Sequence, residues 1–180
     1  MGRRVRPLRT LPVATVTEVA DTVLEVVDAR SASARRAMTS YFAELAERFP
    51  EGFDPGAALD EAVVFLNPPR GLFVIATVDG DAVGCGALQF LDAGTAEIKR
   101  MWVSPSERGR GLGQRLLARL EDEARRAGRL RIVLDTNDAL SEAINMYRSR
   151  GYYSIERYND NPYARLWFAK DLPKVDENPR

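Results

Sequence analysis

The segment that most constrains the fold of this chain is the glycine-rich turn Arg108-Gly109-Arg110-Gly111-Leu112-Gly113. It joins an extended stretch that ends at Val103 to an amphipathic helical pattern. Such a turn lets the backbone approach a ligand closely, and the first N–H groups of the helix have no intrahelical partners. The helix dipole and the two arginines add positive charge there. The segment therefore predicts a site for an anion such as pyrophosphate, with a solvent-exposed basic loop as the alternative.

Composition removes several classes of chemistry. The sequence contains no histidine, which excludes Ser-His-Asp and Cys-His nucleophile pairs and the usual zinc sites. The single cysteine, Cys85, excludes an intrachain disulfide and fits a reducing compartment. Without a histidine to activate it, a buried structural thiol is favoured over a nucleophile. We therefore expect no metal site.

Charge and hydropathy narrow the class of partner. The 26 basic residues balance 26 acidic ones, so the chain lacks the overall positive field of a dedicated nucleic-acid binder. The apolar run from Leu72 to Val78 is far shorter than a membrane span, and no long apolar stretch follows the basic N-terminus. We expect a cytoplasmic protein that binds neither nucleic acid nor a membrane.

The order of apolar patterns predicts one mixed α/β domain over residues 18–173, between a loose basic arm at 1–17 and a tail at 174–180. Helical patterns follow a cap at Ser31 or Ser33 and recur near residues 57–64, 112–127 and 140–150. Extended patterns cover residues 23–27, 72–78, 82–91, a stretch ending at 103, 131–134, 153–157 and 165–170. Turns at 79–81 and 92–94 connect three of these strands as an antiparallel meander.

The stretch from Ala96 to Tyr152 resembles the GNAT superfamily of N-acetyltransferases. The phosphate-loop signature of that family is Arg or Gln, two residues, Gly, any residue, then Gly or Ala, and Arg108, Gly111 and Gly113 match it completely. The resemblance implies a GNAT-like α/β fold, with a mixed, mostly antiparallel sheet of six to seven strands and about four helices on both faces.

A second family signature places a helix tyrosine four residues before a glycine–aromatic pair, and Tyr147, Gly151 and Tyr152 resemble it. Together the two signatures imply transfer of an acetyl group from acetyl-CoA, a co-substrate, to an amine. In the family the transfer takes place in a ternary complex, with no covalent enzyme intermediate and no metal.

The resemblance also assigns the acetyl-CoA contacts. Amide N–H groups at Arg108, Gly109, Arg110, Gly111, Leu112 and Gly113 would bind the pyrophosphate. The preceding strand is splayed from its neighbour in the family, so free backbone groups near Met101, Trp102 and Val103 would pair with the pantetheine arm and polarise the thioester carbonyl. Family members often carry an asparagine where this chain has Leu140. Asn137 could replace that contact or could cap the following helix.

Two residues are candidates for proton transfer. Tyr147 would protonate the departing thiolate, since a phenol with a reference pKa of about 10 carries its proton at neutral pH. A helix tyrosine packed in the core is the alternative. Glu97 resembles a glutamate that some family members use as the base for the amine, directly or through water. A cross-strand ion pair with a lysine or arginine is an equal alternative for Glu97.

The acceptor amine is less well defined. In this fold its pocket is built from the segment after the first helix and the final hairpin. One of these regions carries six carboxylates, Glu44, Glu47, Glu51, Asp54, Asp60 and Glu61, against one base, Arg48. These would attract a cation, although Glu44 and Glu47 are more simply interpreted as a solvated helix face. The turn at 158–163 supplies polar and aromatic groups. A small-molecule amine and a peptide amine both remain open, as does a homodimer.

Two other functions compete with this hypothesis. Gly109, Gly111 and Gly113 open a helix and Asp135 ends a strand about twenty residues later, as in dinucleotide-binding domains. However, Gln114 occupies the place of the third glycine, and the preceding meander is not a βαβ unit. The second competitor is a GNAT-like module that binds CoA or a partner without catalysis. The presence of Tyr147 argues against it.

Overall fold

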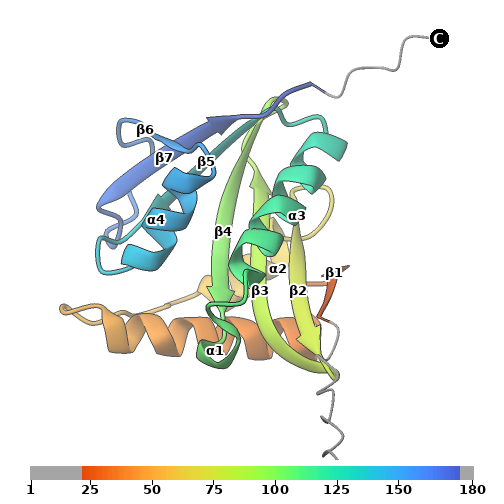
Figure 1. The fold of residues 1–180 in the computed structure, drawn as a ribbon, viewed down its shortest axis with the longest axis vertical. Helices are drawn as coiled ribbons and strands as arrows, with labels where there is room; N and C mark the ends of the chain where they lie inside the picture. Colours follow the sequence, from red (N-terminus) through yellow and green to blue (C-terminus); the bar gives the residue numbers. More distant parts are fainter. Residues whose placement is uncertain (1–21, 175–180) are drawn as a thin grey trace, which may run out of the picture.

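A computed structural model of the chain describes residues 22–174 (Figure 1). Its strands form one seven-stranded sheet in the order β1-β2-β3-β4-β5-β7-β6. The strands are β1 (Val23–Val27), β2 (Gly71–Val78), β3 (Asp81–Phe90), β4 (Thr95–Val103), β5 (Arg131–Thr136), β6 (Tyr153–Ser154) and β7 (Leu166–Asp171). Neighbouring strands are antiparallel except β4 and β5. The mostly antiparallel sheet that the sequence predicts is therefore confirmed, whereas the arm predicted at 1–17 lies outside the described residues.

Helices cover both faces of the sheet, as predicted. They are α1 (Ala32–Arg48), α2 (Ala58–Phe65), α3 (Leu112–Arg126) and α4 (Ser141–Ser149). Successive residues of β2 separate the two layers: Phe73 packs in a cluster with α1 and α2, whereas Val74 packs in a cluster with α3 and α4. Of the two predicted caps for α1, Ser31 is the one used, since its hydroxyl accepts a hydrogen bond from the Ala34 N–H.

The predicted last hairpin is the main departure from the sequence pattern. The strand expected over 153–157 ends at Ser154. One further backbone hydrogen bond, from the Ile155 N–H to the Trp167 carbonyl oxygen at 3.0 Å, still joins the chain to β7. Farther on, Tyr158 and Asn159 donate hydrogen bonds to the carboxylate of Glu97. A polar group buried in β4 therefore recruits residues that would otherwise extend β6.

The parallel pair β4 and β5 opens after a short contact. Only Thr95–Glu97 of β4 pairs with β5, opposite Arg131–Val133. From Ile98 onward β4 pairs with β3 but not with β5, and the rest of β5 pairs with β7. Figure 1 shows the two strands diverging from a common end. Backbone groups of β4 that point into this opening have no strand partner among residues 22–174.

A β-bulge lies in β4 within this opening. Lys99 pairs with Ala87 and Trp102 with Cys85, so both Arg100 and Met101 lie opposite Gly86. Arg100 adopts a positive φ of 57°. The extra residue reverses the alternation: Ile98 packs toward α3 and α4, whereas Trp102 packs toward α1 and α2.

The thiol of Cys85 adjoins this bulge. It is fully buried and its Sγ donates to the Arg100 carbonyl oxygen at 3.2 Å. Burial raises the pKa of the thiol to about 12, so it stays protonated near neutral pH. The structure thus agrees with a structural thiol rather than a nucleophile.

Glu44 connects α1 to β4 and to the glycine-rich turn. Its carboxylate accepts hydrogen bonds from Trp102 Nε1 at 2.9 Å, from Arg48 at 3.2 Å and from Arg108. The prediction of a solvated face is therefore wrong for Glu44, because two arginines and an indole converge on it, whereas Glu47 is exposed. Burial alone would raise the pKa of the Glu44 carboxyl, but the hydrogen bonds from Arg108, Trp102 and Arg48 outweigh it and lower the pKa.

We expect Glu44→Gln to lower the free energy of unfolding at pH 7 by about 1 kcal/mol, since partial exposure screens the ion pairs. A carboxyl whose folded-state pKa is lowered stabilises the fold above its unfolded value, here 4.5, and loses this contribution as pH falls. The difference from wild type should therefore shrink in urea titrations at pH 4 and below. Glu47→Gln on the same helix is the control and should match wild type. An equal loss at pH 7 and pH 3 would contradict this role.

Candidate active site

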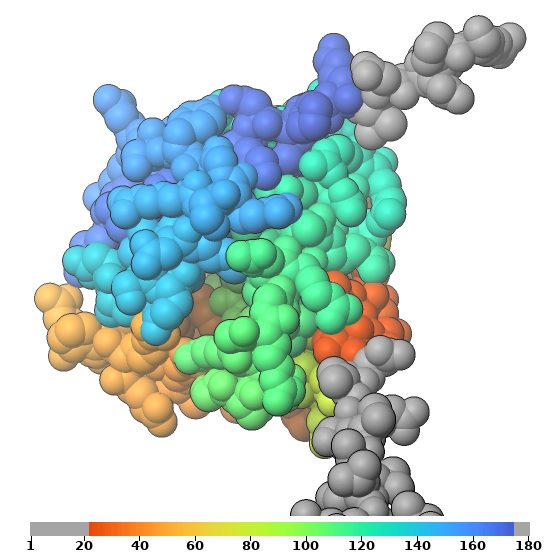
Figure 2. Space-filling view, viewed as in Figure 1, coloured from red at the N-terminus to blue at the C-terminus, as the bar shows by residue number. Residues whose placement is uncertain are grey.

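Two adjoining cavities flank the open end of β4. The loop cavity, of about 440 Å³, is lined by α1, the tip of β4, the glycine-rich turn and α4. The strand cavity, of about 280 Å³, lies where β4 and β5 separate. Both cavities include Tyr41, Leu45, Met101, Leu140 and Ala143 in their walls. Figure 2 shows the surface hollowed where orange α1, the green turn and blue α4 meet.

The glycine-rich turn presents backbone to the loop cavity. Gly109 and Gly111 adopt positive φ values of 76° and 79°, which glycine takes at least cost. Gly111 is the N-cap of α3, and no side chain caps the helix. The first amides of α3 therefore keep the free donors that an anion site requires. Gly113 packs closely, since a Cβ there would lie 3.1 Å from Met146 Sδ.

The two arginine side chains of the turn interact with other protein groups and do not leave unpaired positive charges at the cavity. Arg108 pairs with Glu44 and donates from Nε to the Val103 carbonyl oxygen at 3.0 Å. Arg110 pairs with Glu107 at 3.2 Å. The Leu112 side chain is buried in the core. Charge from the two arginines, expected from the sequence to act on an anion directly, is thus partly neutralised by carboxylates.

The tip of β4 lines the loop cavity with Met101, Trp102 and Val103. The Trp102 side chain points away from the α3 layer, and its indole is tied to Glu44. These three residues therefore line the cavity partly with backbone atoms, along the edge of β4 that no longer pairs with β5. A ligand with amide groups could pair with this edge as an added strand would.

Tyr147 on α4 lies in the wall of the strand cavity. Its ring packs between Tyr152 and Phe168, with centroid distances of 5.6 and 6.5 Å. Within residues 22–174 its hydroxyl has no hydrogen-bond partner. Burial raises the pKa of this phenol, with smaller contributions from Tyr41 and Asp135. The ring thus contributes to the core while a protonated hydroxyl stays available.

Glu97 lies outside both cavity walls. Its buried carboxylate forms an ion pair with Lys99 at 2.9 Å, and accepts hydrogen bonds from Tyr158 at 2.8 Å and Asn159 at 3.2 Å. Burial raises the pKa of the Tyr158 phenol, and the negative charge of Glu97 raises it further. The ion pair that was the alternative for Glu97 is present, although Lys99 comes from the same strand.

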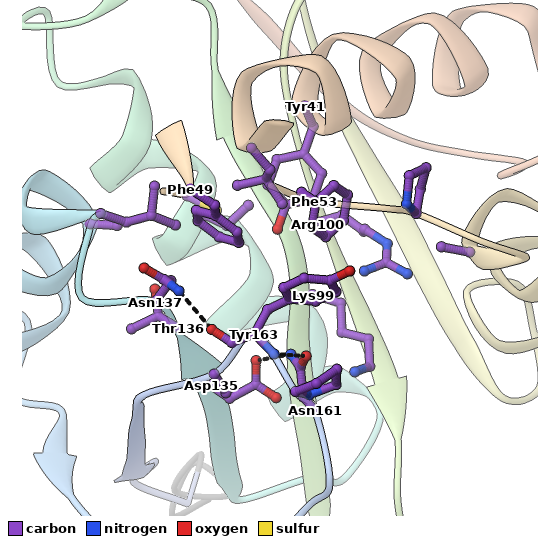
Figure 3. Close-up of a pocket in the computed structure, with 18 of the residues that line it drawn as sticks. Tyr41, Phe49, Phe53, Lys99, Arg100, Asp135, Thr136, Asn137, Asn161 and Tyr163 are labelled. Atoms are coloured by element: carbon purple, nitrogen blue, oxygen red, sulfur yellow. Dashed lines mark hydrogen bonds between the residues drawn. The ribbon is translucent and has the colours of Figure 1, made fainter. Parts of the chain in front are cut away.

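Asp135, at the end of β5, is the carboxylate that this strand presents to the strand cavity (Figure 3). It accepts hydrogen bonds from the side-chain amides of Asn159 and Asn161, the latter at 2.9 Å. Asn159 Nδ2 bridges Asp135 and Glu97, and Trp167 Nε1 donates to Asn159 Oδ1 at 3.0 Å. From the sequence, Asp135 was a candidate only as the strand-end acid of the dinucleotide-binding alternative. Its place at the carboxyl end of a strand was the available signal.

Asn137 is committed to local structure. Its Nδ2 donates to the Tyr163 carbonyl oxygen at 2.7 Å, and its Oδ1 accepts from the Ala139 N–H at 2.9 Å. It lines the strand cavity and not the loop cavity. Helix α4 begins at Ser141 with Leu140 as its N-cap and no side-chain cap, so these contacts form a turn before α4 and do not cap it.

The remaining wall of the strand cavity is aromatic and acidic. Phe49, Phe53 and Tyr163 form a continuous aromatic cluster, with Phe53 and Tyr163 ring centroids 4.8 Å apart. Of the six carboxylates predicted to attract a cation, Asp54 and Glu61 line this cavity.

The part of the chain that the structure describes holds no group of three potential metal-ligating His, Cys, Asp or Glu residues. None of its helices is both long and apolar enough to cross a membrane.

Comparisons with known proteins agree with this geometry. The model of the acetyltransferase (GNAT) family matches residues 37–152. The chain is 43% identical over 100 residues to an IAA acetyltransferase of Azospirillum brasilense, a match that covers 55% of this chain and 64% of that protein.

Solved structures show the same fold. A GNAT acetyltransferase of Staphylococcus aureus superposes with a TM-score of 0.73 at 17% identity, over 84% of this chain and all of that one. A GNAT acetyltransferase of Elizabethkingia anophelis, solved with acetyl-CoA bound, gives 0.61 at 17% identity over 84% and 98%. With the splayed strands, the uncapped glycine-rich turn and the family match in agreement, this chain belongs to the GNAT family of N-acetyltransferases.

Proposed function

We propose that this enzyme transfers an acetyl group from acetyl-CoA to a primary amine by direct attack in a ternary complex. The observation that carries the proposal is the meeting of two cavities at the open edge of β4, with Met101 in both walls. One cavity ends at an uncapped helix N-terminus suited to pyrophosphate, and the other is lined by carboxylates suited to an amine. The acetyl-CoA-bound fold neighbour supports the choice of donor.

In this proposal the amides from Arg108 to Gly113 bind the pyrophosphate and the β4 edge at Met101, Trp102 and Val103 binds the pantetheine arm. A backbone N–H of this edge polarises the thioester carbonyl. The amine nitrogen forms the new C–N bond as the C–S bond breaks. Tyr147 gives its proton to the departing sulfur, and the amine proton passes to a carboxylate.

The route of the amine proton distinguishes two carboxylates. Asp135 lies in the wall of the strand cavity, so it can take the proton from the amine directly. Glu97 is screened from the cavity and paired with Lys99, so the amine proton could reach it only through water, while its link to Asp135 through the Asn159 amide can only orient that carboxylate. We therefore propose Asp135 as the first acceptor and Glu97 as the group that orients it.

The proposal as a whole is tested by isothermal titration with acetyl-CoA, followed by CoA-release assays over a panel of amines. We expect acetyl-CoA to bind, NAD not to bind, and at least one amine to be acetylated. Acetyl-CoA binding without turnover of any amine would favour a non-catalytic CoA-binding module. Binding of NAD would contradict the assignment of the turn.

We expect Tyr147→Phe to lower kcat by roughly ten- to a thousand-fold with little change in acetyl-CoA affinity. The substitution removes a hydroxyl without a protein partner, so the unfolding free energy should stay close to that of wild type. Tyr153→Phe, on the exposed strand β6, is the control for activity after the loss of a phenol oxygen outside both cavities; its hydroxyl, unlike that of Tyr147, bonds to Arg131 and Asp171. Unchanged turnover in the purified Tyr147 variant would remove this residue from the mechanism.

We expect Asp135→Asn to lower kcat/KM for the amine by roughly a hundred-fold, because a direct base contributes this much. Glu97→Gln should have a smaller effect, since its Asn159 and Tyr158 contacts can be partly kept. The measurement is kcat/KM for the amine in both variants under the same conditions. If Glu97→Gln instead causes the larger loss while Asp135→Asn stays near wild type, Glu97 is the base.

A further inference from the structure

We propose that the acceptor amine also carries a carboxylate and that Arg100 binds this group. The inference rests on the proposed function and specifies the substrate class of the same site, an amino carboxylate with an apolar side chain. Arg100 and Lys99 are the basic residues in the strand-cavity wall (Figure 3).

The charges around the strand cavity leave Arg100 without a counterion. Lys99 is paired with Glu97. Within residues 22–174 Arg100 forms no ion pair and no side-chain hydrogen bond, and its buried Nε has no partner. Glu61 lines the same cavity but does not pair with it. A buried guanidinium donor without a partner is costly, and a carboxylate is the group whose geometry it fits best.

The arginines of the neighbouring loop cavity differ from Arg100. Arg48 pairs with Glu44 and Glu142, and Arg108 pairs with Glu44. Within residues 22–174, protein carboxylates thus pair with the arginines beside the proposed cofactor path, and none pairs with the arginine beside the acceptor. This contrast favours a ligand carboxylate at Arg100.

The backbone of Arg100 points to the same conclusion. Its φ of 57° is a conformation that glycine adopts at lower cost. Strain of this kind persists where the surrounding structure requires it, most often at functional sites. The guanidinium is held over the Phe42 ring, 5.1 Å from its centroid. Arg100 thus combines a strained backbone with a guanidinium that is fixed in place by the Phe42 ring.

The rest of the cavity accommodates the other parts of such a substrate. Asp135, on the facing strand, can receive the ammonium group. The cluster of Phe49, Phe53 and Tyr163 offers an aromatic surface to an apolar side chain. An amine that lacks the carboxylate would leave the Arg100 donors unpaired, which is how a polar site discriminates against an incomplete substrate.

The test compares L-phenylalanine and L-leucine with phenethylamine and isoamylamine, the same amines without the carboxylate. We expect kcat/KM to be at least about ten-fold higher for the two amino acids, the smallest effect of a charge-assisted hydrogen bond. Arg100→Gln should bring this ratio within about three-fold of one by slowing the amino acids alone. Arg70→Gln is the matched control, because Arg70 also stacks on a phenylalanine but lines neither the strand cavity nor the loop cavity. It should leave the ratio unchanged.

A binding measurement keeps the inference independent of catalysis. We expect 3-phenylpropanoate, which lacks the amine, to bind wild type in isothermal titration and to bind Arg100→Gln at least about ten-fold more weakly. Urea unfolding checks that the variant is folded, and Arg100→Lys provides a charged replacement if it is not. Equal ratios in wild type and Arg100→Gln, or unaltered phenylpropanoate binding, would overturn the carboxylate subsite while leaving acetyl transfer intact. Failure of every amine despite acetyl-CoA binding would instead contradict the proposed function.

Discussion

The extra residue in β4 is the constraint on which the site depends. Because Arg100 and Met101 share one partner position in β3, the strand changes which face each later residue presents. Trp102 can therefore reach α1 and Glu44, while Met101 contributes to both cavities. Without the bulge, the alternation of β4 would place Trp102 in the α3 layer with Ile98, and the contact that ties α1 to the strand tip would be lost.

Glu44 extends this constraint to the glycine-rich turn. Its carboxylate accepts a hydrogen bond from the indole of Trp102 in the strand and another from the guanidinium of Arg108 in the turn. The loop amides are thereby held against α1 at a fixed distance from the β4 edge. The arginine of the phosphate-loop signature thus positions the loop through a protein carboxylate. Backbone N–H groups are left as the donors for an anion, which is a geometry that does not depend on flexible side chains.

The sequence predicted the elements better than the site within them. Apolar periodicity located the four helices and the longer strands, because burial of one face is a local property of the pattern, whereas the exposed β6 is shorter than predicted. The bulge was missed, since Arg100 is not a residue expected at positive φ. A signal existed: two successive polar residues, Lys99 and Arg100, interrupt the alternation that places Ala96 and Ile98 on one face. The Asn159 bridge had no such signal, because it joins strands β4 and β5 through a turn distant in sequence.

The absence of histidine makes the environment of Tyr147 decisive. A free phenol has a pKa about 1.5 units above that of a thiol, so protonating a thiolate from tyrosine is unfavourable by about 2 kcal/mol in water. Burial raises the pKa of Tyr147 further and would by itself enlarge this gap. The same burial disfavours a thiolate formed beside it, whose pKa rises for the same reason. In the proposed mechanism, proton transfer from Tyr147 would therefore be effective only if the leaving sulfur occupied the same desolvated space, which would require both substrates to close the cavity before the C–S bond breaks.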